Sequence, residues 1–435
     1  MRNQESNPQR PQGPPSQKIR KINPRDIAVP PGYRVEVFAA GLTTPINIMF
    51  TDNGAMLAAD VGVAAGDGKV LMRIGQEFQT VAEGFHPPLT GINTYQGNIY
   101  VSHRGLITVV KPDGTREDIL TGLPSWGDHH NNRVVFGPDG KMYFGQGTAT
   151  NSGVVGEDNR WISRYPSFHD FPGAPVTLTG QNVATKNFLA PSPYDIAYTG
   201  AFSPYGVAAQ PGEVIPGTTA ASGSILRANP DGSNLELVAW GLRNPFRIKF
   251  DRHNRLYAAN HGMDVRGSRP VANSPDEFQL IVPGMWYGWP DFSGGLPVTM
   301  PLFKPDDQPQ PTFLIAQHPM QPPQPLVNFT PHAATMGFDF NYLTGFGPAG
   351  DVFIAEFGAE DPGTTGGKLI PGVGHRVTRI DMRTGKRTSF AVNKSGFAAS
   401  HTGGGGLERP IDVAFGPDGA MYVADFGQTD AESGG

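Results

Sequence analysis

The chain has 435 residues, a formal net charge of −5 and no cysteine. The charge balance leaves no basic footprint for nucleic acid, no apolar run is long enough for a membrane-spanning helix, and the lack of cysteine excludes disulfides and thiolate chemistry. The 57 glycines and 42 prolines are spread over the whole chain, which favours many short strands over long helices.

The first 28 residues are rich in Gln, Asn, Pro and Arg and contain no apolar core. They lack the central hydrophobic stretch of a signal peptide, and we expect them to form a flexible tail. Residues 29–435 are expected to form one domain, because all-β folds of this size often remain single units.

One hairpin pattern recurs six times after the tail. An apolar strand is followed by a tight turn and by a second apolar strand that ends in a small residue. The turn residues are Gly54, Gly97, Gly140, Asn254, Gly350 and Gly419. The first two spacings (97 − 54 and 140 − 97) are both 43 residues, a length typical of one propeller blade, and the later spacings are 114, 96 and 69.

A second strand pair follows most copies of the hairpin, for example in KVLMRIGQEFQTVAEG and LITVVKPDGTREDIL. Four strands per copy and six copies predict an all-β fold, a six-bladed β-propeller with four-stranded blades. The segment GYRVEVFAAGL at residues 32–42 resembles the outermost strand of the other blades. We therefore expect it to complete the last blade.

Two long insertions interrupt the repeat, at about residues 151–221 and 263–331. Loops of this length in a compact domain are usually functional or disordered, and the aromatic content argues against disorder. If they leave the ends of inner strands, they lie over the mouth of the central channel. Aromatic faces there suit sugar binding, and the alternative is that they only pack the loops onto the propeller.

Three stretches, DHHNNRVVFGPDGKMY, GLRNPFRIKF and DEFQLIVPGMWYGWP, resemble the glucose/sorbosone dehydrogenase family. The resemblance extends from about Gly32 to Gly427. It implies a propeller that uses pyrroloquinoline quinone and Ca²⁺. This chain reads Ala355-Glu356-Phe357-Gly358 where glucose-oxidising members have a cofactor-binding lysine, so it is more similar to the sorbosone type.

His129 is the candidate general base, since it lies just before an inner strand in the family pattern Asp-His-x-x-x-Arg. The ordinary pKa of histidine, about 6.5, lets the side chain accept a proton near neutrality. A structural role for His129, or the same role for adjacent His130, is the alternative. Asp128 would orient the imidazole or bind substrate.

The resemblance also implies a cofactor and metal site. Arg243 and Asn244 are expected to bind the quinone, with a salt bridge and an Asn-Pro turn as the alternative. Arg243 would also stabilise charge during catalysis. His332 and Arg409 are two further candidate cofactor ligands. Gly262 and Met263 would bind the cofactor calcium through their backbone carbonyls, and Asp276 and Glu277 would bind a structural calcium through their carboxylates.

The expected activity is oxidation of an aldose or sugar aldehyde to a lactone or acid, with hydride transfer to the quinone and an external electron acceptor. A catalytically silent carbohydrate- or protein-binding propeller and a metal-dependent lactonase are the alternatives. The resemblance implies a periplasmic or extracellular location, although the chain starts without an export signal.

Overall fold

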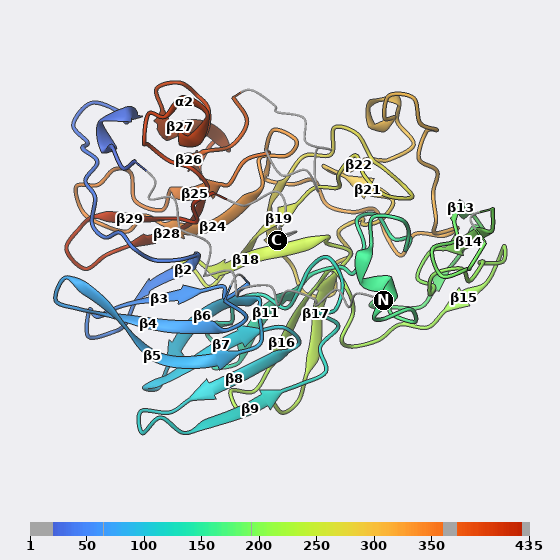
Figure 1. Ribbon diagram of the computed structural model, residues 1–435, viewed down its shortest axis with the longest axis horizontal. Coiled ribbons are helices and arrows are strands. Elements are labelled where there is room, and N and C mark those ends of the chain that lie inside the picture. Colours follow the sequence, from blue (N-terminus) through green and yellow to red (C-terminus); the bar gives the residue numbers. More distant parts are fainter. Residues whose placement is uncertain (1–20, 64, 193, 360–371, 429–435) are drawn as a thin grey trace, which may run out of the picture.

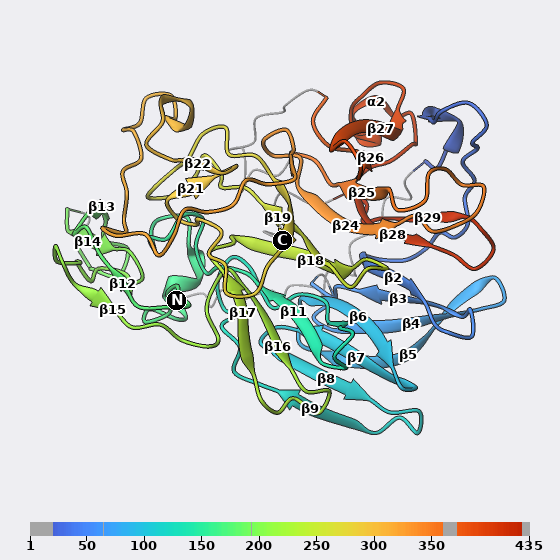
Figure 2. The same ribbon diagram turned by 180° about the vertical axis from the view of Figure 1, so that it is seen from behind.

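A computed structural model of the chain describes residues 21–359 and 372–428, apart from 64 and 193. Its strands form sheets around a common centre, and the helices are a few short turns (Figures 1 and 2). The predicted all-β, propeller-like arrangement is confirmed. In the described part of the chain, no helix is long and apolar enough to cross a membrane.

Five sheets contain four or five strands each, and every neighbouring pair is antiparallel. In the first two sheets the strands follow the chain: β2 (Pro45–Phe50), β3 (Met56–Asp60), β4 (Gly68–Ile74) and β5 (Glu77–Phe85), then β6 (Leu89–Tyr95), β7 (Asn98–His103), β8 (Leu106–Val110) and β9 (Arg116–Leu120). These sheets match the regular 43-residue copies of the repeat.

The next three sheets are interrupted by the insertions. Their strands are β10 (Val135–Phe136), β11 (Met142–Gln146), β16 (Ser224–Ala228) and β17 (Glu236–Trp240); β18 (Asn244–Phe250), β19 (Leu256–His261), β20 (Glu277–Ile281) and β23 (Val327–Asn328); and β24 (Thr335–Phe340), β25 (Val352–Glu356), β26 (Arg376–Asp381) and β27 (Lys386–Asn393). β20 and β23 complete the fourth sheet, so part of the segment expected as the second insertion belongs to the propeller itself.

The last repeat forms a sheet of two strands in the described residues, β28 (Pro410–Phe415) and β29 (Met421–Asp425). β28 lies between β24 and β2 and contacts both, which closes the ring of inner strands. The expected outer strand at residues 32–42 is wrong, because no strand forms there. Val37 and Phe38 are both exposed, so the segment lacks the one-sided burial of a strand, and it contacts β29 through the rings of Phe38 and Tyr422, 4.6 Å apart.

The boundary of the predicted tail also needs correction. Residues 1–20 of that segment lie outside the described residues, whereas the last part has a defined structure. The Asn23 side chain caps a short 3₁₀ turn, η1 (Pro24–Asp26), and β1 (Ile27–Ala28) pairs with β27. These residues therefore add a fifth strand to one sheet.

The two insertions pack against each other beside the third and fourth sheets, at the right of Figure 1. The first contains η2 (Arg160–Ser163), the pair β12 (Val176–Thr177) and β15 (Val214–Ile215), and the hairpin β13 (Asn182–Lys186) and β14 (Ile196–Gly200). The second contains β21 (Phe292–Ser293), β22 (Leu296–Pro297) and η3 (Pro301–Phe303). A bridge joins Leu178 to Ile315, and Trp286 and Trp289 are buried in the shared core. A short helix, α2 (Ala399–Thr402), precedes β28.

Polar side chains fill the centre of the ring of inner strands. The carboxylate of Asp412 accepts hydrogen bonds from the Asn47 amide at 2.5 Å and the Arg247 guanidinium at 2.6 Å, and Arg133 lies 4.0 Å away. All of these side chains are largely buried. Because a carboxylate held by two arginines has its charge compensated, this centre is built for ion pairing between strands rather than for a metal ion.

Candidate cofactor and catalytic site at the ends of the inner strands

The predicted site residues lie at one end of the strands. Asn244, at the start of β18, pairs with His261, at the end of β19, and Thr335 at the start of β24 pairs with Glu356 at the end of β25. Entries to inner strands and exits from second strands therefore share one face, which we call the mouth. His129, Arg243, His332 and Arg409 all lie within a few residues before an inner strand. Antiparallel pairing thus places residues far apart in sequence at the same end.

His129 is held by the carbonyl group of Thr148. The imidazole Nδ1 lies 2.9 Å from Thr148 O, and the backbone N–H of His129 donates to the same oxygen. Because a carbonyl only accepts, Nδ1 carries the hydrogen, and Nε2 of the neutral ring keeps its lone pair. Among the described residues no hydrogen bond to Nε2 is found. This imidazole is therefore ready to accept a proton through Nε2.

Electrostatics distinguishes His129 from its neighbour His130. Burial and the positive charges of Arg243 and Arg266 hold the pKa of His129 well below its ordinary value. His130 instead bonds through Nδ1 to Ser125 O at 2.8 Å, and burial lowers its pKa to about 4. Only His129 is thus close to Arg243 and Arg266, so it lies beside the arginine network of the mouth and His130 does not.

Close backbone packing brings His129 next to Asn244. A Cβ atom on Gly147 would lie 2.3 Å from the His129 Cβ and 2.8 Å from the Asn244 Oδ1, so only glycine fits between them. The Asn244 side chain accepts from Asn132 and donates to Nδ1 of His261, both at 3.1 Å. His261 in turn donates from Nε2 to Thr335 O at 2.8 Å. This chain of bonds joins the third, fourth and fifth sheets.

Arg243 is buried and bound from two sides. Its guanidinium donates to the backbone and side-chain oxygens of Asn151, each at 3.0 Å, and to Asp264 at 2.7 Å. The salt bridge that was the alternative interpretation of Arg243 is therefore present. Nη1 of Arg243 has no bond to the described residues, which leaves one edge of the guanidinium for a ligand.

Asp264 joins the cations of the mouth. Besides Arg243 it contacts Arg266 at 3.4 Å, and its other oxygen lies 3.4 Å from Nδ1 of His332. These charges hold the pKa of Asp264 below its ordinary value, against the effect of burial. Sequence reasoning missed Asp264 and Arg266, whose only signal was their position directly after Met263.

Asp128 does not contact His129. One of its oxygens accepts from Asn159 and Trp161, each at 3.0 Å, and the other binds Arg266 at 2.8 Å. The structure thus gives Asp128 a different role from orienting the imidazole. It anchors the first insertion to the mouth, and its place in substrate binding stays a prediction.

The predicted calcium residues differ in what they offer. Asp276 accepts from the backbone of Gly262 at 2.8 Å and of Thr335 at 2.6 Å. Glu277 accepts from Asn260 at 3.0 Å and from Gly294 at 2.6 Å, and burial raises its pKa. Both carboxylates therefore hold backbone and amide N–H groups, and among the described residues no group of three or more His, Asp or Glu side chains is arranged for a metal.

The backbone oxygens of Gly262 and Met263 remain available in the described part of the structure. A cavity lined by Arg243, His261, Gly262, Met263 and Trp289 lies beside them, and its volume of ≈ 10 Å³ is close to that of one water position. Carbonyl oxygens are ligands that Ca²⁺ accepts, but this space requires further ligand atoms from a bound molecule.

Arg409 has buried donor groups that lack hydrogen-bond acceptors among the described residues. It is 5% exposed, and its Nε and Nη1 are buried with no hydrogen-bond acceptor in the described residues. The guanidinium carbon lies 4.9 Å from the centre of the Phe357 ring. An unpaired buried guanidinium is costly, so an anionic or carbonyl-bearing group fits here. Glu356, in the stretch that lacks the lysine of glucose-oxidising family members, bonds to Thr378.

The chain is similar to known proteins in sequence and in fold. Residues 210–356 match the Glucose / Sorbosone dehydrogenase family model. Quinoprotein glucose dehydrogenase B of Acinetobacter calcoaceticus is 28% identical over 197 residues, which cover 45% of this chain and 32% of that protein. The HIPL1 protein of Arabidopsis thaliana is 28% identical over 226 residues, 51% of this chain and 26% of that protein. The matched parts thus span about a third or less of these curated relatives.

Solved structures extend the likeness to nearly the whole fold. The PQQ-bound aldose sugar dehydrogenase of Streptomyces coelicolor aligns with a TM-score of 0.52 at 16% identity, covering 92% of each chain. The calcium structure of the Trichoderma reesei carbohydrate-active enzyme of family AA12 aligns with a TM-score of 0.59 at 14% identity, covering 93% of this chain and 96% of that one. About a third of the chain thus matches the Glucose / Sorbosone dehydrogenase family model, and the solved structures share the fold of nearly the whole chain.

Proposed function

We propose that this protein is a quinoprotein sugar dehydrogenase, which oxidises an aldose or a sugar aldehyde with pyrroloquinoline quinone and Ca²⁺. The observation that carries the proposal is that a neutral imidazole and a buried guanidinium with unsatisfied N–H groups lie on the same face, the mouth. Nε2 of His129 is free to accept a proton, and Arg409 has buried N–H groups without acceptors in the described residues. The family and the structural relatives support a dehydrogenase of this kind.

The cofactor would be held by arginines. Arg409 offers two buried donors, and Arg243 offers the free edge of its guanidinium, with Asn244 beside it. A quinone that carries carboxylates matches such donors in charge and in bond geometry. Gly262 and Met263 would contribute carbonyl oxygens to Ca²⁺, together with oxygens of the quinone. His332 joins this group through Asp264.

The chain's own residues supply binding, orientation and proton transfer. His129 accepts the proton of the substrate hydroxyl at Nε2, and the Thr148 carbonyl keeps the ring in the required tautomer. Arg243 stays protonated and stabilises negative charge that develops near it. The quinone, when bound, accepts the hydride from the substrate carbon, and an external acceptor later removes the electrons.

The proposal also includes the sixth blade, the type of substrate and the location of the protein. The hairpin β28 and β29 would be the sixth blade, since it occupies the gap between β24 and β2. The lack of the glucose-type lysine in residues 355–358 favours a sorbosone-type substrate over glucose. A location outside the cytoplasm is consistent with the proposed cofactor use.

The test is reconstitution of the purified chain with quinone and Ca²⁺. We expect a change in quinone absorbance on binding and dye reduction with an aldose or sugar aldehyde that needs both additions. His129→Ala should keep quinone binding and lose turnover. Absence of any absorbance change would overturn the cofactor assignment, whereas quinone binding without turnover on any sugar would indicate the silent binding propeller.

A further inference from the structure

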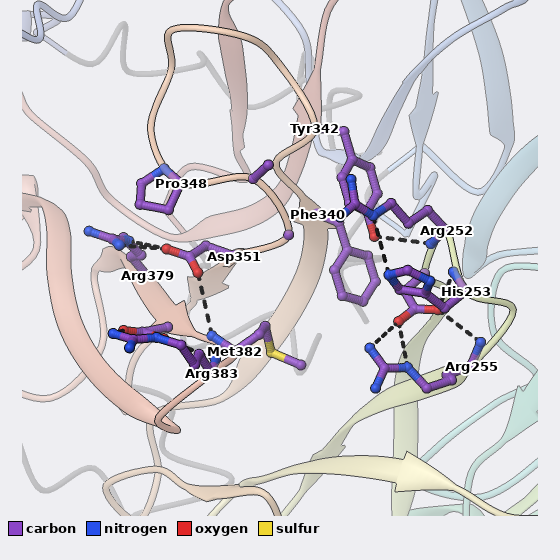
Figure 3. Close-up of a pocket in the computed structure, with 14 residues that line it drawn as sticks. Arg252, His253, Arg255, Phe340, Tyr342, Pro348, Asp351, Arg379, Met382 and Arg383 are labelled. Atoms are coloured by element: carbon purple, nitrogen blue, oxygen red, sulfur yellow. Dashed lines mark hydrogen bonds and ion pairs between the residues drawn. The ribbon is translucent and has the colours of Figure 1, made fainter.

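A cavity of ≈ 530 Å³ lies at the end of the strands opposite the mouth. It is bounded by the turns between β18 and β19, β24 and β25, and β26 and β27, as the close-up in Figure 3 shows. In β18 the mouth residue Asn244 pairs with His261, whereas Phe250 at the other end pairs with Leu256. A strand of this length rises about 20 Å, so the cavity is separate from the proposed quinone site.

Four arginines and three aspartates line the cavity, a balance of +1 (4 − 3) in a chain whose net charge is −5. Two of the carboxylates are already compensated. Asp251 lies 2.6 Å from Arg255, and Asp351 binds Arg379 through two nitrogens at 2.5 and 2.6 Å. These two ion pairs form the walls of the cavity. Arg252 and Arg383 are the lining cations that remain.

Arg252 and Arg383 are the cations with charge to offer. Arg383 is 87% exposed and lies 4.0 Å from Asp381, a separation at which an exposed pair contributes little. Arg252 forms no ion pair with the described residues. Its Nε donates to His253 at 3.3 Å, and both Nη atoms remain free of protein partners there. Both arginines can therefore turn toward a bound anion.

An apolar surface lies beside these cations. The rings of Phe340 and Tyr342 are stacked with centroids 6.0 Å apart, and the Arg252 guanidinium carbon lies 5.3 Å from the Tyr342 centroid. Met382 stands on the other wall, beside Asp351 (Figure 3). The cavity thus combines an aromatic face, a thioether and two available guanidinium groups, within the volume range of small-molecule sites.

We propose that this cavity binds a small organic anion, in which a phosphate or carboxylate group is attached to a flat ring. The anion would contact Arg252 and Arg383, and the ring would lie against Tyr342 and Met382. The proposal is independent of the quinone site. It assigns a ligand to the face of the propeller opposite the mouth.

Methionine methyl resonances give a direct test, because Met382 reports on this cavity and Met263 on the mouth. The protein is labelled with ¹³C-methyl methionine, and Met382→Leu identifies the signal. Phenyl phosphate and benzoate are titrated as the two anion types, with inorganic phosphate and benzyl alcohol as the probes that lack the ring or the charge. We expect a saturable shift of Met382 with at least one aromatic anion and no shift of Met263.

Variants test the role of the two cations. Arg252→Gln or Arg383→Gln should weaken binding about threefold, and the double variant about tenfold. Arg73→Gln is the matched control, since Arg73 also lies over a ring, that of Phe38 at 3.5 Å, in another sheet. The control should leave the affinity unchanged.

Three results would overturn the proposal. One is no saturable shift of Met382 with either aromatic anion. Another is an equal response to benzyl alcohol or to inorganic phosphate, since charge and ring would then not be recognised together. The third is unchanged affinity in the double variant. None of these depends on quinone binding, so the proposed enzyme activity stands or falls separately.

Discussion

The two ends of the inner strands use charged residues in different ways. At the mouth, Arg243 and Asp264 are about 5% and 11% exposed and are joined to Arg266 and His332 in one buried network. At the opposite end, Arg379 and Asp351 form a comparable pair, but Arg379 is 32% exposed. The strands are shared, so the difference arises from the segments around each pair. Residues of the two insertions surround Arg243 and Asp264 at the mouth, whereas three turns enclose the cavity at the other end.

The same strands thus carry a buried ion pair at one end and a more exposed ion pair at the other. The β18–β19 and β24–β25 ladders run from the mouth to the opposite end and hold both faces in place. Burial strengthens the electrostatic interactions of Arg243 and Asp264 at the mouth, where both side chains are largely excluded from water. The Arg243–Asp264 pair lowers the pKa of Asp264 and lies beside His129, whereas the Arg379–Asp351 pair lines a cavity.

The largest expected effect is on catalysis at His129. His129→Ala should lower kcat by about 10²–10⁴-fold in the reconstituted dehydrogenase assay, because the substrate proton loses its acceptor. His130→Gln is the control, since His130 is held by Ser125 O and lies apart from the mouth arginines. An equal loss in both variants would mean that the region matters only for folding.

The same Asp→Asn change at both ends compares the two ion pairs directly. Asp264→Asn leaves the buried Arg243 without its counter-charge and should lower the free energy of unfolding by about 3 kcal/mol. Asp351→Asn should cost about 1 kcal/mol or less, because Arg379 can reach water. Urea unfolding of both variants measures the difference, and equal losses would contradict the contrast in burial.

Asp170, a buried residue near the mouth, should make the free energy of unfolding depend on pH. It accepts from Ala149 and Thr150, next to the residue that holds His129, and burial raises its pKa to about 6. Between pH 4 and 6 the folded state keeps a proton that the unfolded state has lost, so stability falls as pH rises, by up to about 3 kcal/mol.

Asp170→Asn tests this assignment, because the amide does not titrate. In the variant, the free energy of unfolding should lack the decrease between pH 4 and 6 that Asp170 causes in the wild type. The measurement is the difference between the wild-type and variant free energies of unfolding at each pH. A difference that is constant over this range would show that Asp170 ionises at its ordinary pKa.

The smallest effects are expected for two glycines at opposite ends of the third sheet. Gly147→Ala pushes a methyl group against His129 and should cost about 1–3 kcal/mol together with a loss of activity. Gly140→Ala strains a turn with φ of +73° and should cost about 1 kcal/mol, with activity unchanged in the folded protein. Thermal unfolding and the dye assay separate the two outcomes.

The sequence by itself determined the repeat. Period-two alternation and tight glycine turns are local signals, and each of the six predicted hairpins is present. Family motifs located His129, Arg243 and Arg409 before inner strands, where the structure has them. The same local signals misassigned residues 32–42, because an apolar-looking segment becomes a strand only if a neighbouring edge pairs with it.

Only the tertiary structure decided how the site is connected. Asp264 and Arg266 join the network because antiparallel pairing and the two insertions bring distant segments to one face, and no local pattern marks them. The same holds for Asp128, which turned out to bind Arg266, and for the cavity formed by three separate turns. Strand formation depends on neighbours along the chain, whereas burial and charge pairing depend on which segments meet in space.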